Sequence, residues 1–273
     1  MRFIKLHHHI VQFNSASHIF RRNFVLITKT PDNLAIVQLN RPPVNALSLD
    51  FMTKIKHTFI ELNEDKSIEG IILGSFSEKI FSSGLDLHEI QQVENVKKIA
   101  AEFTNMSSTL YGSISKPFAV AISGHAPAGG TVLAMCADYR VVTPNAYLGL
   151  NEARLGIVVP SWLSLMYQNL IGQRQSELAL MLGTLFNSKY ALKLGLVDEI
   201  VEDKDEAIRK CTEIVRRLIK EPEKEARELS KILSRKNVLL EMKLDRNGET
   251  MASFFKRDKV QSSIKSYLKT LKK

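Results

Sequence analysis

Three short segments combine glycines with polar residues at the predicted ends of strands, where backbone amides and side chains can act on a ligand. They are Phe81–Leu87, Ser123–Gly130 and Leu148–Gly156. The pair Gly129-Gly130 is predicted to open a helix directly after a strand, which leaves backbone N–H groups free at the positive end of the helix dipole. Such a turn favours an anion or a developing oxyanion. Neither a phosphate loop nor a dinucleotide site is predicted, because no Gly-Lys-Ser/Thr follows and G-x-G-x-x-G is absent.

The third segment contains an acidic residue, Glu152, between Asn151 and Arg154. From residue types alone, a surface carboxylate that caps a helix or pairs with Arg154 is the simpler interpretation. A carboxylate in an apolar pocket would instead have a raised pKa and could exchange protons with carbon. The chemistry of this segment therefore depends on where the fold places Glu152.

Short apolar strands and amphipathic helices alternate around these segments. The predicted strands are Phe24–Thr28, Leu34–Leu39, Gly70–Leu73, Pro117–Ile122 and Arg140–Val142. The predicted helices are one that starts after the capping residue Ser48, one over Ile90–Tyr111 and one over Gly129–Cys136. This repetition predicts an α/β core with a mainly parallel sheet over residues 24–200. Residues 201–273 are predicted to be a helical region that packs on its own core or makes subunit contacts.

Composition and charge exclude several classes of protein. The chain has 273 residues, is 44% hydrophobic and carries a net charge of +9. The positive charge lies at the ends, with +5 over residues 1–31 and +6 over residues 251–273, which leaves −2 for the body. A protein that mainly binds duplex nucleic acid would carry a basic face on its body. Two cysteines do not make a disulfide framework, and a buried, inert thiol is expected at Cys136. No apolar stretch is long enough for a membrane span.

The N-terminal segment, residues 1–23, is predicted to be a mitochondrial targeting sequence. It has spaced Arg and Lys residues, hydroxyl residues and no acid, and it lacks the continuous apolar centre of a secretory signal. The pair Arg21-Arg22 marks a candidate processing point. The run His7-His8-His9 does not predict a metal site, since no Cys or carboxylate lies near it.

Five segments together resemble the enoyl-CoA hydratase/isomerase (crotonase) superfamily, from about Ile27 to the C-terminus. They are Arg41–Ser48, Phe81–Leu87, Ala126–Gly130, Cys136–Arg140 and Leu148–Gly156. Within the superfamily the chain most resembles the mitochondrial 3,2-trans-enoyl-CoA isomerases. The resemblance implies a crotonase-like α/β fold, a spiral of ββα units followed by a helical C-terminal region, assembled as homotrimers.

The resemblance also assigns roles to residues. It implies an oxyanion hole made by the backbone N–H groups of Leu85 and Gly129, and Glu152 as the acid/base carboxylate. Substrate contacts are implied at Ser83, Gly84, Leu85, Asp86, Leu87, Gly129 and Asn151. Phe81 and Trp162 are candidates for the border of the acyl pocket, although a core position suits Trp162 equally well.

The residue type at position 132 distinguishes the two main activities of the superfamily, hydration and isomerisation. Its hydratases use a second glutamate three residues after the position that matches Gly129, and this chain has Val132 there. One carboxylate can move a proton between two carbons but adds water poorly, so isomerisation of a 3-enoyl-CoA to a trans-2-enoyl-CoA in fatty-acid β-oxidation is favoured. Neither a metal nor a cofactor is expected, because CoA belongs to the substrate. The expected location is the mitochondrial matrix.

Two alternatives to this function stay open. One is a 2-enoyl-CoA hydratase. The other is a non-catalytic protein with the same fold that binds RNA through the basic C-terminus. For that terminus the expected structure is a solvated helix face, since the basic residues alternate with apolar ones at helical spacing.

Overall fold

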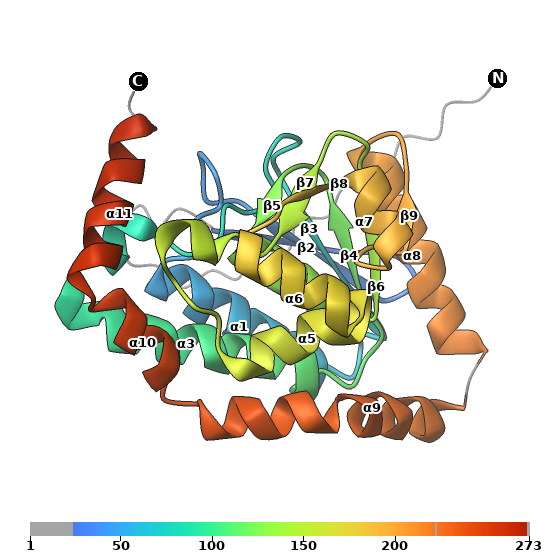
Figure 1. Ribbon diagram of the computed structural model, residues 1–273. Coiled ribbons are helices and arrows are strands. Elements are labelled where there is room, and N and C mark those ends of the chain that lie inside the picture. The colour runs from blue at the N-terminus through green and yellow to red at the C-terminus, as the bar shows by residue number, and fades with distance from the viewer. Residues whose placement is uncertain (1–23, 222, 272–273) are drawn as a thin grey trace, which may run out of the picture.

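The computed structural model describes residues 24–221 and 223–271 (Figure 1). The predicted targeting segment, with its three histidines and its arginine pair, lies outside the described residues. Within the described residues, no helix is both long enough and apolar enough to cross a membrane.

A six-stranded sheet forms the centre of the molecule, in the spatial order β1-β2-β3-β4-β6-β9. Its strands are β1 (Val25–Lys29), β2 (Leu34–Leu39), β3 (Gly70–Ser75), β4 (Phe118–Ile122), β6 (Tyr139–Val142) and β9 (Glu199–Ile200). The first two strands form an antiparallel hairpin, and all further neighbours pair in parallel. Every residue of β3 and β4 is buried, as expected for parallel strands covered on both faces. The predicted α/β core with a mainly parallel sheet is confirmed.

Three very short strands form a second sheet beside the first. They are β5 (Ala126–Pro127), β7 (Tyr147–Gly149) and β8 (Phe186–Asn187), in the order β5-β7-β8. The pairing of β5 with β7 is parallel, and that of β7 with β8 is antiparallel. This small sheet holds two of the glycine-containing segments side by side.

Helices cover both faces of the central sheet (Figure 1). One face packs against α8 (Lys204–Lys220) through a small core that includes Cys211 and Val215. The other face packs against the larger core, to which α1 (Leu49–Glu64), α3 (Val96–Ser108), α4 (Gly129–Met135) and α5 (Ser161–Ile171) contribute. Helix α8 therefore packs on the central sheet, although it lies after residue 200, where the predicted helical region begins.

The start of α1 agrees with its sequence signal. The Ser48 hydroxyl accepts a hydrogen bond from the Phe51 N–H at 3.3 Å, which satisfies one of the unpaired donors of the first turn. The apolar residues that recur at helical spacing along α1 are buried, among them Met52, Ile55, Phe59 and Leu62. The cap and this spacing are local signals, so the sequence specified this helix well.

The prediction of one continuous helix over residues 90–111 is wrong. The structure divides the region into α2 (Leu87–Ile90), a 3-10 turn η1 (Val93–Asn95), α3 and a π-helical turn η2 (Thr109–Ser113). A contact distant in sequence lies at the break. The Gln91 side-chain amide donates to the Gln261 carbonyl oxygen at 3.1 Å, and the Gln261 amide donates to the Ile90 carbonyl oxygen at 3.0 Å. A helical pattern read along the chain cannot include such a contact.

The remaining helices include those of the C-terminal region. They are α6 (Gln173–Leu182), α7 (Ser188–Leu194), α9 (Lys224–Leu244), α10 (Glu249–Phe255) and α11 (Asp258–Thr270). In Figure 1, α9 runs along one side of the molecule, below α3 and α5. Arg235 joins α9 to the core, because its guanidinium donates to the carbonyl oxygens of Tyr111 and Ala137. In α11, Val260 and Ile264 are buried while the lysines are exposed, which is the solvated basic face expected from the sequence.

Candidate active site

Two loops bring main-chain amides into contact at one point of the molecule. Gly84 has a φ of 82°, and Ala128, just before α4, has a φ of 52°. A Cβ atom placed on Gly84 would lie 2.8 Å from the Gly129 nitrogen, and one placed on Gly129 would lie 3.1 Å from the Gly84 Cα. Only glycine allows this approach of the two backbones. The absence of side chains at Gly84 and Gly129 thus allows the first two glycine-containing segments to pack this closely.

The N–H groups of Leu85 and Gly129 make no hydrogen bond to any described residue. Leu47 bridges the neighbouring residues, since its N–H donates to the Gly84 carbonyl oxygen at 2.8 Å and its carbonyl oxygen accepts from the Asp86 N–H at 3.1 Å. In this extended pairing, the Leu85 N–H points away from Leu47. Gly129 is the first residue of α4, where an N–H has no partner within the helix. Neither N–H donates to a group in the described part of the chain, so both are free to donate a hydrogen bond to a ligand oxygen.

The small sheet brings the chain segment that leads to Gly129 next to the segment that leads to Glu152. The last residue pair of the β5–β7 ladder joins Pro127 and Gly149, and the Ala128 N–H donates to the Gly149 carbonyl oxygen at 2.8 Å. Gly129 lies two residues after Pro127, the last residue of β5. Glu152 lies three residues after Gly149, the last residue of β7. The two segments therefore leave the ladder side by side.

The Glu152 side chain faces inward. Residue Glu152 opens a short 3-10 helix, η3 (Glu152–Leu155), and its Oε2 atom is buried without a hydrogen bond to any described residue. Arg154 is exposed, and no ion pair joins it to Glu152 within the described structure. The simpler interpretation from residue types, a capping or ion-paired surface carboxylate, is therefore wrong. Burial raises the pKa of Glu152 to about 7, because removal from water disfavours the charged form.

A cavity of about 340 Å³ lies next to this carboxyl group. Apart from Glu152 and Ser164, its wall is apolar and consists of Leu150, Ala153, Ile157, Val158, Val159, Leu180 and Met181. Such a wall suits a hydrocarbon chain. The described wall does not include Leu85 or Gly129, so the amide pair lies outside this cavity.

The other predicted substrate contacts lie around the same loops. Asp86 is engaged with protein groups: its carboxylate accepts from Arg41 at 2.8 Å and from the His88 N–H at 3.1 Å, where it caps α2. The Ser83 N–H donates to the Val44 carbonyl oxygen at 3.0 Å, and Leu87 packs against the core as the first residue of α2. The Asn151 carbonyl oxygen accepts from the Arg154 N–H at 3.1 Å. For these residues, contact with a substrate stays a prediction.

Residue types alone did not identify the cavity residues on α5 and α6. Ser164, Leu180 and Met181 read as parts of ordinary helix surfaces, and no local signal distinguishes a cavity wall from a packed face. Trp162 is fully buried and donates from its indole nitrogen to Asp245 at 3.3 Å, so it is a core residue. Phe81 is also fully buried.

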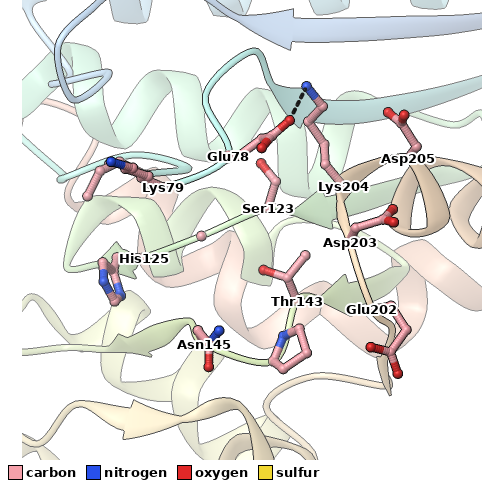
Figure 2. A pocket seen from close by; sticks show the side chains of 13 residues that line it. Glu78, Lys79, Ser123, His125, Thr143, Asn145, Glu202, Asp203, Lys204 and Asp205 are labelled. Atoms are coloured by element: carbon pink, nitrogen blue, oxygen red, sulfur yellow. Dashed lines mark ion pairs between the residues drawn. The ribbon is translucent and has the colours of Figure 1, made fainter.

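A second cavity, of about 790 Å³, opens at the carboxyl ends of the central strands (Figure 2). Charged side chains surround it, among them Glu202, Asp203 and the ion pair of Glu78 with Lys204 at 3.5 Å. None of the predicted site residues lines it, and its polar wall does not suit an acyl chain. Over residues 24–221 and 223–271, no group of three or more His, Cys, Asp or Glu residues could hold a metal ion.

Comparisons with known proteins agree with this fold. The model of the family "Enoyl-CoA hydratase/isomerase" matches residues 29–273, and the chain belongs to this family. It is 40% identical over 263 residues to the mouse (Mus musculus) protein "Enoyl-CoA delta isomerase 1, mitochondrial", covering 93% of this chain and 89% of the relative. The human relative of the same name is 34% identical, covering 88% of this chain and 80% of the relative.

Solved structures show the same relationship. The crystal structure of human mitochondrial delta3-delta2-enoyl-CoA isomerase superposes with a TM-score of 0.86 at 33% identity, covering 92% of this chain and 98% of that one. Among the sequence relatives, a crotonyl-CoA hydratase from Syntrophomonas wolfei is less similar than the mouse and human proteins, at 29% identity over 184 residues, covering 66% of this chain and 70% of the relative. The crotonase fold predicted from the five segments is confirmed.

Proposed function

We propose that this chain is a 3,2-trans-enoyl-CoA isomerase, which moves the double bond of a 3-enoyl-CoA to the trans-2 position in fatty-acid β-oxidation. The observation that carries the proposal is the buried Oε2 atom of Glu152, which has no hydrogen-bond partner among the described residues. Glu152 lies three residues beyond β7, and the neighbouring strand β5 leads to the Gly129 amide. The names of the isomerase relatives support it.

The proposed mechanism assigns one role to each group. The thioester oxygen accepts hydrogen bonds from the N–H groups of Leu85 and Gly129. The Glu152 carboxylate removes a proton from C2, which the thioester makes acidic, and the two amides stabilise the dienolate oxygen. The double bond moves, and Glu152 returns its proton to C4. Substrate and product are at the same oxidation level, so the proton transfer calls for no redox cofactor, and CoA is part of the substrate.

Val132 supports isomerisation over hydration. It is a fully buried residue of α4, on the turn that begins at Gly129. Hydratases of the superfamily carry their second glutamate at this position. An apolar side chain there leaves Glu152 as the one carboxylate assigned to the reaction, and a second acid to activate water is missing from that position.

The substrate preference tests the proposal. Purified protein is offered 3-hexenoyl-CoA and crotonyl-CoA separately, and the conjugated 2-enoyl thioester and the 3-hydroxyacyl product are measured. We expect double-bond migration to be faster than hydration by about tenfold or more, since one carboxylate handles both proton transfers of the isomerisation. Hydration faster than migration would contradict the isomerase assignment in favour of a hydratase.

The reaction should depend on pH through Glu152. Only the ionised carboxylate removes the C2 proton, and burial raises the pKa of this group to about 7. We therefore expect kcat/KM for 3-hexenoyl-CoA to rise with pH through about 7 and then to level off. A pH–rate profile that is already flat between pH 5 and pH 8 would show that another group is the base.

Assembly and location are proposed with the same function. We propose a homotrimer, supported by the apolar residues that α9 exposes, such as Leu233 and Leu244. We also propose import into the mitochondrial matrix by residues 1–23, followed by a core over residues 24–200 and a helical region over residues 201–273. The mitochondrial names of the relatives support this location.

A further inference from the structure

Two buried polar atoms without partners occur near the end of β7. One is the Glu152 Oε2 atom, and the other is the hydroxyl of Tyr167, a fully buried residue of α5. Neither atom makes a hydrogen bond within the described chain. Buried polar atoms without partners are rare because each costs free energy. A hydroxyl supplies a donor and a carboxylate supplies an acceptor, so the two requirements are complementary.

The Tyr167 hydroxyl lies over the strand that leads to Glu152. A Cβ atom placed on Gly149 would lie 3.4 Å from the hydroxyl oxygen. The next residue, Leu150, has its N–H close enough to lower the pKa of Tyr167, although burial raises that pKa more strongly. The Glu152 carboxylate also raises the pKa of Tyr167, so the two groups are electrostatic neighbours. The phenol therefore keeps its proton at physiological pH and can act as a donor to the carboxylate.

Few other charged groups can act on this carboxylate. The one charged neighbour on its own turn, Arg154, is exposed. The residues that α5 and α6 place in the cavity wall, Ser164, Leu180 and Met181, carry no charge. From α11, which packs against η3, Val260 faces Gly156 while Asp258 and Lys259 are exposed. Among the described residues, no charged side chain shifts the pKa of Glu152.

We propose that Tyr167 is a positioning residue: its hydroxyl donates a hydrogen bond, through one bridging water molecule, to the ionised carboxylate of Glu152. As a role in catalysis, the proposal rests on the proposed isomerase function. The hydrogen bond would stabilise the base before proton abstraction and hold its orientation. It would weaken when Glu152 takes the proton from C2, and so it would not oppose delivery of that proton to C4.

The variant Tyr167→Phe tests this role, because it removes only the hydroxyl. Without the donor, the carboxylate is less stable and its pKa rises. We expect the acid limb of the kcat/KM profile to move up by about one pH unit, so that the variant is about tenfold slower than the wild type at pH 6 and within about twofold of it at pH 9. A residue with only a packing role would lower activity equally at every pH, and that result, or an unmoved profile, would overturn the proposal.

Tyr111→Phe is the matched control. Tyr111 is also a buried tyrosine, but its hydroxyl has a partner in Asn169, and the residue lines a different cavity. We expect its pH profile to match that of the wild type. An equal shift in the control would overturn the assignment to Tyr167.

A titration that needs no turnover separates this inference from the proposed function. The side-chain carboxyl signal of Glu152 is followed by NMR with isotope-labelled glutamate and is assigned by its loss in Glu152→Gln. A higher midpoint in Tyr167→Phe than in the wild type supports the hydrogen bond, and equal midpoints overturn it. Absence of isomerase activity in the wild type would refute the proposed function, whatever the titration shows.

Discussion

Replacing Glu152 with glutamine is expected to lower isomerase kcat by about 10²- to 10⁴-fold, the range that a positioned general base contributes. The amide has nearly the same shape as the carboxyl group but cannot take a proton from C2. The measurement is turnover of 3-hexenoyl-CoA under saturating conditions. If the variant kept turnover within about tenfold of the wild type, a different residue would be the base.

The same variant should change how stability depends on pH, which checks that Glu152 is buried. In the wild type, the pKa is raised from 4.5 to about 7 on folding, so the folded state holds its proton over that interval while the unfolded state loses it. The wild type is therefore expected to lose about 3 kcal/mol of unfolding free energy between pH 4.5 and pH 7, as an upper limit. Glutamine does not titrate, so Glu152→Gln should lack this loss. Chemical denaturation at several pH values measures the difference.

Glu177→Gln is the matched control for both measurements. It makes the same change on α6, where the carboxylate pairs with Arg174 and both side chains are exposed. We expect turnover to be unchanged and stability to fall by less than about 1 kcal/mol. A loss of turnover in this control comparable with that in Glu152→Gln would mean that the assay does not report on the site.

Placing a methyl group on Gly84 is expected to lower kcat by about 10²- to 10³-fold without touching the carboxylate. The new Cβ atom would lie 2.8 Å from the Gly129 nitrogen, closer than nonbonded atoms allow, so one of the two loops must move. Because Leu85 follows directly, the shift would separate the two N–H groups that are proposed to bind the thioester oxygen. Turnover and thermal unfolding of Gly84→Ala are measured together.

Gly172→Ala separates backbone strain from displacement of the amides. Gly172 has a φ of 78°, close to the 82° of Gly84, but a Cβ atom there would meet nothing within 4 Å. Both variants should lose about 1–2 kcal/mol of stability from strain, and only Gly84→Ala should lose turnover. Normal turnover in Gly84→Ala would remove the amide pair from the mechanism.

The resemblance to the family and the local structure were both accessible from the sequence. Glycine is required where Gly84 approaches Gly129, and Ser48 caps α1 through a contact three residues away. The buried strands were recognisable as short apolar runs bounded by turn residues. Each of these features depends on residue types at short spacing, where the sequence alone carries the signal.

The electrostatic state of Glu152 was decided by tertiary structure. Its burial depends on the pairing of β5 with β7, which joins residues about twenty positions apart, and on cavity walls from α5 and α6. Residue types alone favoured a surface carboxylate, because a lone Glu beside Arg154 looks the same in either setting. Tyr167 was not identified for the same reason: a buried hydroxyl without a partner is defined by atoms that surround it, not by its neighbours in the chain. Local spacing thus determined which groups could do chemistry, whereas long-range packing, which sets solvent exclusion, decided which carboxylate has a raised pKa.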